Sequence, residues 1–349
     1  MEYGKKFTIK TISYTLGILI LLAAVTVIID PFIHYHAPIC GLAAVETDER
    51  SALVGVARNM DYDTALIGSS MSENFKESWF EDGVFGNSCV KLSLQGAHFN
   101  DYDVLFREVS KKKDLKNIVF SLDTYLLTNP PEDYPVTIPS YLSNTSYWDD
   151  ASYVWNKSVL LEYLPKFLIN NVTEHYNADS AYTWADDYVF SKYAARGSYN
   201  AERLLIPEEE KSYDTYFTYS DEFLADIIPY IESCPDVTFY FYSSPYSILF
   251  WDDSVRRGNT TAEICALSRV FEKLLSYDNV RIFYFQDDYD IITDLDNYRD
   301  YSHFDQPINY YMYECMRDGK KEVTLDTYYD TLLNMYQFAI AYDYESAFH

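Results

Sequence analysis

Basic residues are scarce in this sequence. The 349 residues include 27 Lys and Arg against 54 Asp and Glu, which gives a formal net charge of −27. A phosphate backbone is held by clustered Lys and Arg, so nucleic acid is excluded as the main partner. Glycine and proline are also few, at 11 and 12 residues, which excludes collagen-like and low-complexity architectures. Hydrophobic residues nevertheless make up 48% of the chain, enough for a folded core in one large domain or two small ones.

Cysteine is also sparse and lacks a metal-binding pattern. The five cysteines are odd in number, widely spaced and never arranged as C-x-x-C. This excludes a zinc ribbon and a dense disulfide framework. We expect mostly buried free thiols with at most one or two bridges.

The N-terminus contains the one long apolar run. Residues 1–10 carry three lysines and one glutamate, and residues 11–29 carry no charge. Nineteen helical residues rise roughly 28 Å at about 1.5 Å each, close to the thickness of the hydrocarbon core. A cleaved signal peptide is the alternative, but the run is longer than a usual signal core and no A-x-A site follows it. The positive-inside rule then predicts a cytoplasmic tail at 1–10, a transmembrane signal anchor at 11–30 and an extracellular C-terminal domain on the plasma membrane, in a single pass.

Beyond the anchor, short apolar runs alternate with amphipathic helical patterns, which is typical of a parallel sheet covered by helices. We predict an α/β fold with a doubly wound, mainly parallel five-stranded sheet. The expected strands are 64–67, 90–94, 117–122, 237–243 and 280–285. The expected helices are 102–113, 222–232, 262–277, 308–317 and 326–344, the last with its apolar stripe in the core.

The interval between the third and fourth strands is too long for a simple crossover. We therefore predict a membrane-proximal segment at 31–60, an α/β domain made of 61–128 and 221–349, and an aromatic-rich inserted subdomain at 129–220. Open α/β sheets place their sites at the carboxyl ends of the strands, and the insert is expected to lie over this edge.

Two motifs at this edge contain residues suited to nucleophilic catalysis. Ser70 ends a Gly-Ser-Ser turn directly after the first strand, and Asp300 and His303 form a D-x-x-H motif after the fifth. An Asp can hold the Nδ1–H of a His and leave its Nε2 free to take a proton from a serine. Gly96, after the second strand, allows backbone N–H groups to approach an oxyanion. The alternatives are that Ser70 caps a helix, His303 is a satisfied surface or core residue, and Gly96 is an ordinary strand-ending glycine.

Residues after the third and fourth strands complete the expected edge. Tyr246, Ser247 and Trp251 follow the fourth strand and are candidates for binding substrate, with aromatic faces suited to a sugar. Asp123 and Tyr125 follow the third strand and join this candidate set. A packed loop under the insert is the alternative for the Tyr246 segment.

These motifs resemble the SGNH, or GDSL-like, hydrolases, whose fold is a flavodoxin-like three-layer sandwich. The matching blocks are Gly68-Ser69-Ser70, Gly96, and Asp300 with His303. The block after the third strand departs from the family because residues 121–125 contain no Asn. The resemblance implies an oxyanion hole made by the Ser70 and Gly96 amides, with Asn74 as a substitute for the missing Asn.

Longer stretches resemble membrane-anchored SGNH-like proteins of Gram-positive bacteria, which are related in architecture to teichoic-acid D-alanyl transfer and polysaccharide O-acetylation proteins. The matching stretches are 30–36, 68–75, 156–157, 245–251 and 300–303.

The resemblance and the motifs together predict a cell-surface serine esterase or O-acyltransferase. Its substrate would be an acyl group on a cell-envelope polysaccharide or teichoic-type polymer, with a membrane acyl-transfer protein as a further partner. This chemistry requires no metal and no organic cofactor. The alternative is an inactive SGNH-like protein that binds glycans or acts as a scaffold. The acidity of the exported part favours a neutral, zwitterionic or D-alanylated polymer over a strongly anionic one.

Overall fold

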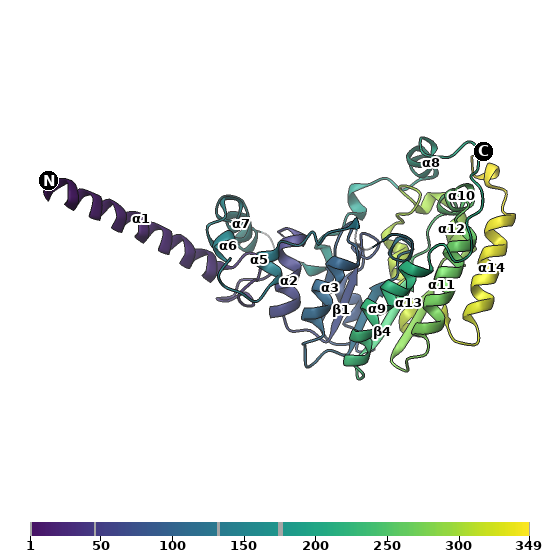
Figure 1. The fold of residues 1–349 in the computed structure, drawn as a ribbon, viewed down its shortest axis with the longest axis horizontal. Coiled ribbons are helices and arrows are strands. Elements are labelled where there is room, and N and C mark those ends of the chain that lie inside the picture. Colours follow the sequence, from purple (N-terminus) through teal and green to yellow (C-terminus); the bar gives the residue numbers. More distant parts are fainter. Residues whose placement is uncertain (1, 45–46, 131–132, 174–176, 349) are drawn as a thin grey trace. The chain divides into compact units, whose positions relative to one another are not determined.

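The chain folds as two compact units. The computed structural model describes residues 2–44, 47–130, 133–173 and 177–348 (Figure 1). The first unit comprises Met1–Asp61 and Thr137–Ala181, and the second comprises Tyr62–Val136 and Tyr182–His349. The segment expected as a single insertion, 129–220, is thus divided between the two units.

The first unit is helical. Its elements are α1 (Glu2–Ile29), α2 (Glu49–Asn59), α5 (Ser140–Ser143), α6 (Ala151–Val154), a π-helical turn (Val159–Tyr163), α7 (Leu164–Thr173) and a 3₁₀ turn (Ala178–Ser180). Helix α1 is long and apolar enough to cross a membrane, and little of it is buried. The apolar helix expected at the N-terminus is therefore present.

A buried carboxylate shapes the turn that follows α1. The two oxygens of Asp30 accept the backbone N–H groups of His34, Tyr35 and His36 at 2.7–3.1 Å and the hydroxyl of Tyr153 at 2.7 Å. Four donors to one side chain fix the chain reversal in residues 30–36, the stretch Asp-Pro-Phe-Ile-His-Tyr-His. This gives that stretch a structural role.

A second carboxylate joins the same turn to α6. Asp150 accepts the hydroxyl of Tyr35 at 2.8 Å and lies 3.4 Å from Nε2 of His34. Phe32 packs in a small core with Tyr153. On α2, Gly55 is required because a Cβ there would clash with the carbonyl oxygen of Phe32.

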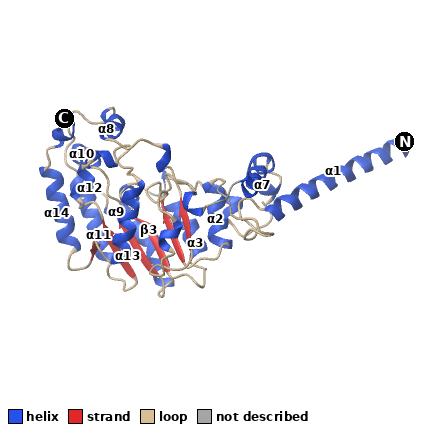
Figure 2. Cartoon of the chain, turned by 180° about the vertical axis from the view of Figure 1, so that it is seen from behind, coloured by secondary structure: helices blue, strands red, loops and turns tan. Residues whose placement is uncertain are grey.

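The second unit is an α/β fold built on a mixed, mostly parallel sheet (Figure 2). Its strands are β1 (Thr64–Gly68), β2 (Cys89–Ser93), β3 (Asn117–Ser121), β4 (Thr238–Ser243), β5 (Val280–Tyr284) and β6 (Glu322–Val323). The order is β2-β1-β3-β4-β5-β6. The five expected strands are present, and their neighbours pair in parallel. The prediction of five strands was one short, because β6 adds an antiparallel edge.

Successive side chains of each strand point to opposite faces of the sheet, and both faces are buried along β1, β2 and β3. On β4, Phe241 meets Phe120 of β3 on one face, while Tyr240 and Tyr242 meet Phe85 and Phe75 on the other.

Helices flank this sheet. The longer ones are α3 (Phe99–Val109), α8 (Lys192–Asn200), α9 (Phe217–Ser233), α10 (Ile248–Arg256), α11 (Thr260–Leu274), α13 (Gln306–Asp318) and α14 (Tyr328–Ala341). The short ones are η1 (Glu77–Phe80), α4 (Tyr125–Thr128), η5 (Ala185–Asp187), α12 (Tyr289–Thr293), η6 (Leu295–Asn297) and η7 (Tyr344–Phe348). Helix α14 buries Leu332, Met335 and Ala339, so the prediction that its apolar stripe lies in the core is confirmed.

Candidate active site

The turn after β1 presents a serine at the edge of the sheet. A Cβ on Gly68 would lie 2.5 Å from Oγ of Ser72, so only glycine lets the chain turn this sharply here. The amide of Leu94 donates to the carbonyl of Gly68 at 2.8 Å, which joins the ends of β1 and β2. Strand β1 lies between β2 and β3, and ligand sites form at such a switch in strand order. Ser70 is half-buried at this point.

Ser70, His303 and Asp300 form one hydrogen-bonded chain. The hydroxyl Oγ of Ser70 lies 2.8 Å from Nε2 of His303, although 233 residues separate them in the sequence. On the other side of the ring, Nδ1 lies 2.8 Å and 3.0 Å from the two oxygens of Asp300. The structure therefore brings the three predicted residues together in the geometry of a catalytic triad.

The loop that carries Asp300 and His303 is closed by its own backbone. Tyr298 and Phe304 pair as an isolated antiparallel bridge, and the amide of Arg299 donates to the carbonyl of His303 at 3.1 Å. Asp300 Oδ1 accepts the amides of Ser302 and His303 at 2.9 Å and 2.8 Å. Backbone bonds thus fix the carboxylate as well as the ring it orients.

The charge of Asp300 is stabilised by these contacts. Burial by itself would raise the pKa of the carboxyl, but the hydrogen bonds and charge of His303 and the amide of Ser302 hold the pKa well below its ordinary value. The guanidinium Nε of Arg299 also lies 3.2 Å from Asp300 Oδ2. Asp300 therefore stays ionised at neutral pH and holds the Nδ1 proton of His303.

Two backbone amides are free to bind an oxyanion. Among the described residues, the N–H groups of Ser70 and Gly96 have no hydrogen-bond partner. Gly96 is exposed and has a φ of 62°, in the left-handed region that favours glycine. Both are the amides expected to hold the oxyanion.

Asn74, expected as a substitute oxyanion donor, holds a neighbouring segment in place. Its Oδ1 accepts the backbone amides of Trp184 and Ala185 at 3.1 Å and 3.2 Å. Its buried Nδ2 has no hydrogen-bond partner among the described residues. The contacts of Asn74 are those of an anchor for the chain at 184–185.

Asp123 lies beneath the nucleophile turn and is fully buried. Its carboxyl accepts hydroxyls from Ser69 at 2.6 Å, Ser121 at 2.9 Å and Tyr246 at 2.8 Å. Burial raises its pKa, although the three hydrogen bonds oppose this shift. Both of its oxygens are occupied by protein donors, so Asp123 supports Ser69 and does not face a substrate.

The other residues expected to bind substrate also have structural contacts. Ser247 is buried at the N-terminus of α10, and Trp251 is only 1% exposed. The hydroxyl of Tyr246 is buried against Asp123, and that of Tyr125 donates to the carbonyl of Ala97 at 2.7 Å. The expectation of an aromatic sugar-binding surface at 246–251 was wrong, because these side chains turn into the core below the edge.

Three residues that sequence analysis missed surround the triad instead. The indole N–H of Trp184 donates to the carbonyl of Ser70 at 3.1 Å, and its ring meets His303 edge-on at 5.5 Å. The guanidinium of Arg299 lies 4.1 Å from the ring centre of Trp184 and 3.9 Å from that of Tyr188. No local motif marks Trp184 or Tyr188. Arg299 directly precedes the D-x-x-H motif, which was its only signal.

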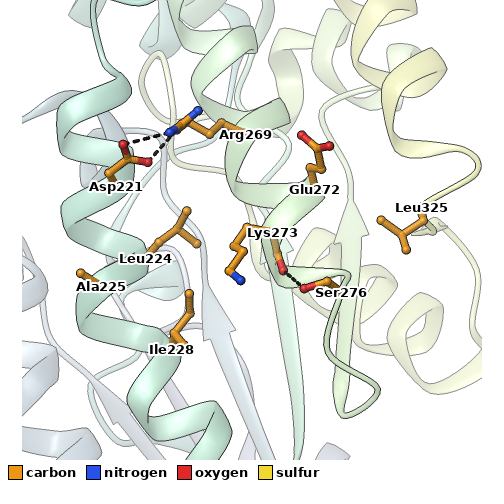
Figure 3. A pocket seen from close by; sticks show the side chains of 9 residues that line it. All are labelled: Asp221, Leu224, Ala225, Ile228, Arg269, Glu272, Lys273, Ser276 and Leu325. Carbon is orange, nitrogen blue, oxygen red and sulfur yellow. Dashed lines mark hydrogen bonds and ion pairs between the residues drawn. The ribbon is translucent and has the colours of Figure 1, made fainter.

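A separate groove of about 770 Å³ lies between α9 and α11 (Figure 3). An ion pair between Arg269 and Asp221, at 2.6 Å and 3.0 Å, bridges the two helices there. The groove is lined mostly by residues of these two helices, with Ser276 and Leu325 from turns, and includes none of the triad.

The geometry of the second unit thus defines an α/β protein with a Ser-His-Asp triad. No protein-family model, curated protein or solved structure matches the chain. Among the described residues, no three His, Cys, Asp or Glu side chains are grouped as a metal site requires. The five cysteines are free thiols, two of them buried.

Proposed function

We propose that this protein is a membrane-anchored serine esterase or O-acyltransferase of the SGNH-like type. The observation that carries the proposal is the 2.8 Å contact between Ser70 Oγ and His303 Nε2, together with the Asp300 carboxylate on Nδ1. A serine hydroxyl is weakly nucleophilic unless a base takes its proton, and this contact places the base in position. The strand order β2-β1-β3-β4-β5 also supports a doubly wound, flavodoxin-like arrangement.

The reaction would proceed through an acyl-enzyme. Ser70 Oγ attacks the carbonyl carbon of the acyl ester while His303 Nε2 takes the hydroxyl proton. The amides of Ser70 and Gly96 bind the oxyanion, and His303 then protonates the leaving alkoxide as the ester bond breaks. Water or a polymer hydroxyl next attacks the acyl-enzyme, with His303 taking its proton and returning it to Ser70. Water as acceptor gives hydrolysis, and a polymer hydroxyl gives transfer.

The N-terminus supports a location at the cell surface. Three lysines lie in the first ten residues, at the N-terminal end of α1, so the positive-inside rule favours a cytoplasmic N-terminus and an extracellular location for the chain beyond α1. An acyl ester on a cell-envelope polysaccharide or teichoic-type polymer is then the accessible substrate. Beyond residue 31 the chain has 24 basic and 52 acidic residues, a net charge of −28. Such a surface favours a neutral, zwitterionic or D-alanylated polymer.

A fluorophosphonate probe tests this proposal, because it modifies only an activated serine. We expect the full-length protein in detergent to be labelled, and Ser70→Ala to abolish the label with an unchanged melting temperature. Ser72→Ala is the matched control: its hydroxyl lies in the same turn but bonds the carbonyl of Ser69 and the hydroxyl of Ser93. An unlabelled wild type that still binds glycans would instead support a non-catalytic glycan-binding or scaffolding role.

A further inference from the structure

The first unit exposes large apolar side chains in one stretch of sequence. Trp148 is 96% exposed, Val172 85% and Leu161 70%. Tyr147, Trp155 and Ile169 are exposed in the same stretch. Exposed apolar residues are ordinary when scattered singly, but six large ones within 26 residues of sequence, in a segment that contacts α1, call for an explanation. We call these six residues the apolar group.

Helix α7 shows that this exposure follows from the pattern of its side chains. Leu164 and Phe167 are buried and form the face of the helix that packs against the protein. Ile169 and Val172, three residues apart, share another face and are exposed. A surface helix in water carries polar residues on its outer face. On α7 these two apolar side chains are exposed beside Lys166 and Thr173, a mixture that suits the boundary between lipid and water.

Contacts with α1 identify that environment. The indole N–H of Trp155 donates to the carbonyl of Leu19 at 3.0 Å, and the hydroxyl of Thr26 lies 3.3 Å from the carbonyl of Val154. Val27 also packs on the small core of the first unit. Figure 1 shows α6 and α7 beside the C-terminal end of α1. Leu19 lies ten residues before the end of the helix, or about 15 Å along its axis.

The charged residues of the segment 137–173 also fit a lipid surface. Residues 137–173 include only five charged side chains in a chain that is otherwise strongly acidic. The two basic ones, Lys157 and Lys166, are exposed, and one of the three acidic ones, Asp150, is buried in the cluster with His34 and Tyr35. Exposed lysines beside Trp and Tyr are the composition that anchors proteins at headgroup level.

We propose that the segment 147–172 is embedded in the outer leaflet of the membrane beside α1, with the apolar group in contact with phospholipid acyl chains. The proposal rests on the membrane anchoring proposed above but not on the triad. Helix α1 passes through the bilayer, and the loop and helices from Trp148 to Val172 lie beside its outer end. The segment would therefore hold the first unit against the membrane surface.

Tryptophan fluorescence tests this directly, because none of the five tryptophans lies in α1. The full-length protein is reconstituted into vesicles of phosphatidylcholine with or without bromine on the acyl chains. Bromine quenches only tryptophans that reach the chains. We expect quenching in the wild type and loss of most of it in the Trp148→Phe/Trp155→Phe double variant. Trp79→Phe, a change in the second unit, is the control and should keep the quenching.

The single variant Trp148→Phe controls for misfolding of the double variant, because the Trp148 side chain is almost fully exposed. This single variant should lose a clear part of the quenching. The proposal is overturned if a protein that floats with the vesicles and resists carbonate extraction shows no bromine quenching. Two further results would also overturn it. In the first, the double variant is quenched as strongly as the wild type. In the second, the double variant loses quenching only when it forms a dimer that can be cross-linked. A protein that does not float refutes the anchoring and this inference together, while fluorophosphonate labelling reports on the triad separately.

Discussion

Each unit of the molecule contains a cluster of histidine and aspartate, and the two clusters differ in what the histidine reaches. In the second unit, His303 links Asp300 to the half-buried hydroxyl of Ser70. In the first, His34 is 6% exposed and faces Asp150, and its Nδ1 has no hydrogen-bond partner among the described residues. Similar residues therefore connect a base to a nucleophile in the second unit. In the first unit they form a buried contact between the turn after α1 and the start of α6.

The carboxylates of the two clusters also differ in the groups that they bind. Asp300 has a lowered pKa because the hydrogen bonds and charge of His303 outweigh burial. Folding therefore favours the ionised form of Asp300, which adds stability above the ordinary pKa of about 3.9, and this stability is lost as the pH falls below it. Asp30 instead accepts three backbone amides and the hydroxyl of Tyr153.

Replacing the histidine of each cluster should give the largest difference in reaction rate between the two clusters. His303→Ala should lower kcat/KM for p-nitrophenyl acetate by roughly 10⁶-fold, since the base of the triad is lost. His34→Ala should leave the rate within about twofold of the wild type, because His34 lies against Asp150 and the rings of Tyr35 and Tyr153. Rates are compared after both variants pass a melting-temperature check. A large loss in His34→Ala at an unchanged melting temperature would contradict the assignment of His34 as structural.

Asp300→Asn should lower the same rate by roughly 10⁴-fold, because the amide cannot fix the Nδ1–H tautomer of His303. It should also remove stability that depends on the charge. The difference in melting temperature between the wild type and Asp300→Asn is expected to shrink as the pH falls below about 4, where the carboxyl takes up a proton in the unfolded chain. A difference that grows as the pH falls below about 4 would refute the lowered pKa of Asp300.

Asp30→Ala should act on stability alone. It removes the acceptor of three backbone amides and the Tyr153 hydroxyl, so we expect a loss of about 3 kcal/mol in the unfolding free energy. Calorimetry of the full-length protein in detergent measures this loss. The rate of fluorophosphonate labelling at 20 °C should stay unchanged. Tyr153→Phe removes one donor to Asp30 and the acceptor of the Phe32 amide, so it should cost about 2 kcal/mol. Equal losses in the two variants would contradict the central position of Asp30.

Much of the sheet and the triad could be predicted because their signals are local. Short apolar runs mark β1 to β5, and a glycine-serine turn and D-x-x-H follow the ends of β1 and β5. Parallel strands bring such ends to one edge, so Ser70 and His303 could be paired without contact data. The two residues of β6 have no periodicity, and α2, within the segment predicted only as membrane-proximal, was missed.

The surroundings of the triad could not be predicted because they depend on which way side chains turn. Tyr246 and Trp251 follow β4 at the expected edge, but α10 turns them inward. Trp184 reaches Ser70 only because Asn74 holds its backbone across 110 residues of sequence. Position along a strand can be counted in the sequence, whereas such long-range packing cannot.

The smallest predicted effect concerns Trp184, which touches the triad without belonging to it. Trp184→Phe keeps an aromatic ring beside His303 and Arg299 but removes the N–H donor to the carbonyl of Ser70. The loss of one hydrogen bond is worth about 1 kcal/mol, so kcat/KM for p-nitrophenyl acetate should fall about fivefold. Trp148→Phe, an exposed tryptophan of the first unit, is the matched control and should not change the rate. A loss above roughly 100-fold, at an unchanged melting temperature, would exceed what one hydrogen bond supplies, and Trp184 would then have to contact the substrate itself.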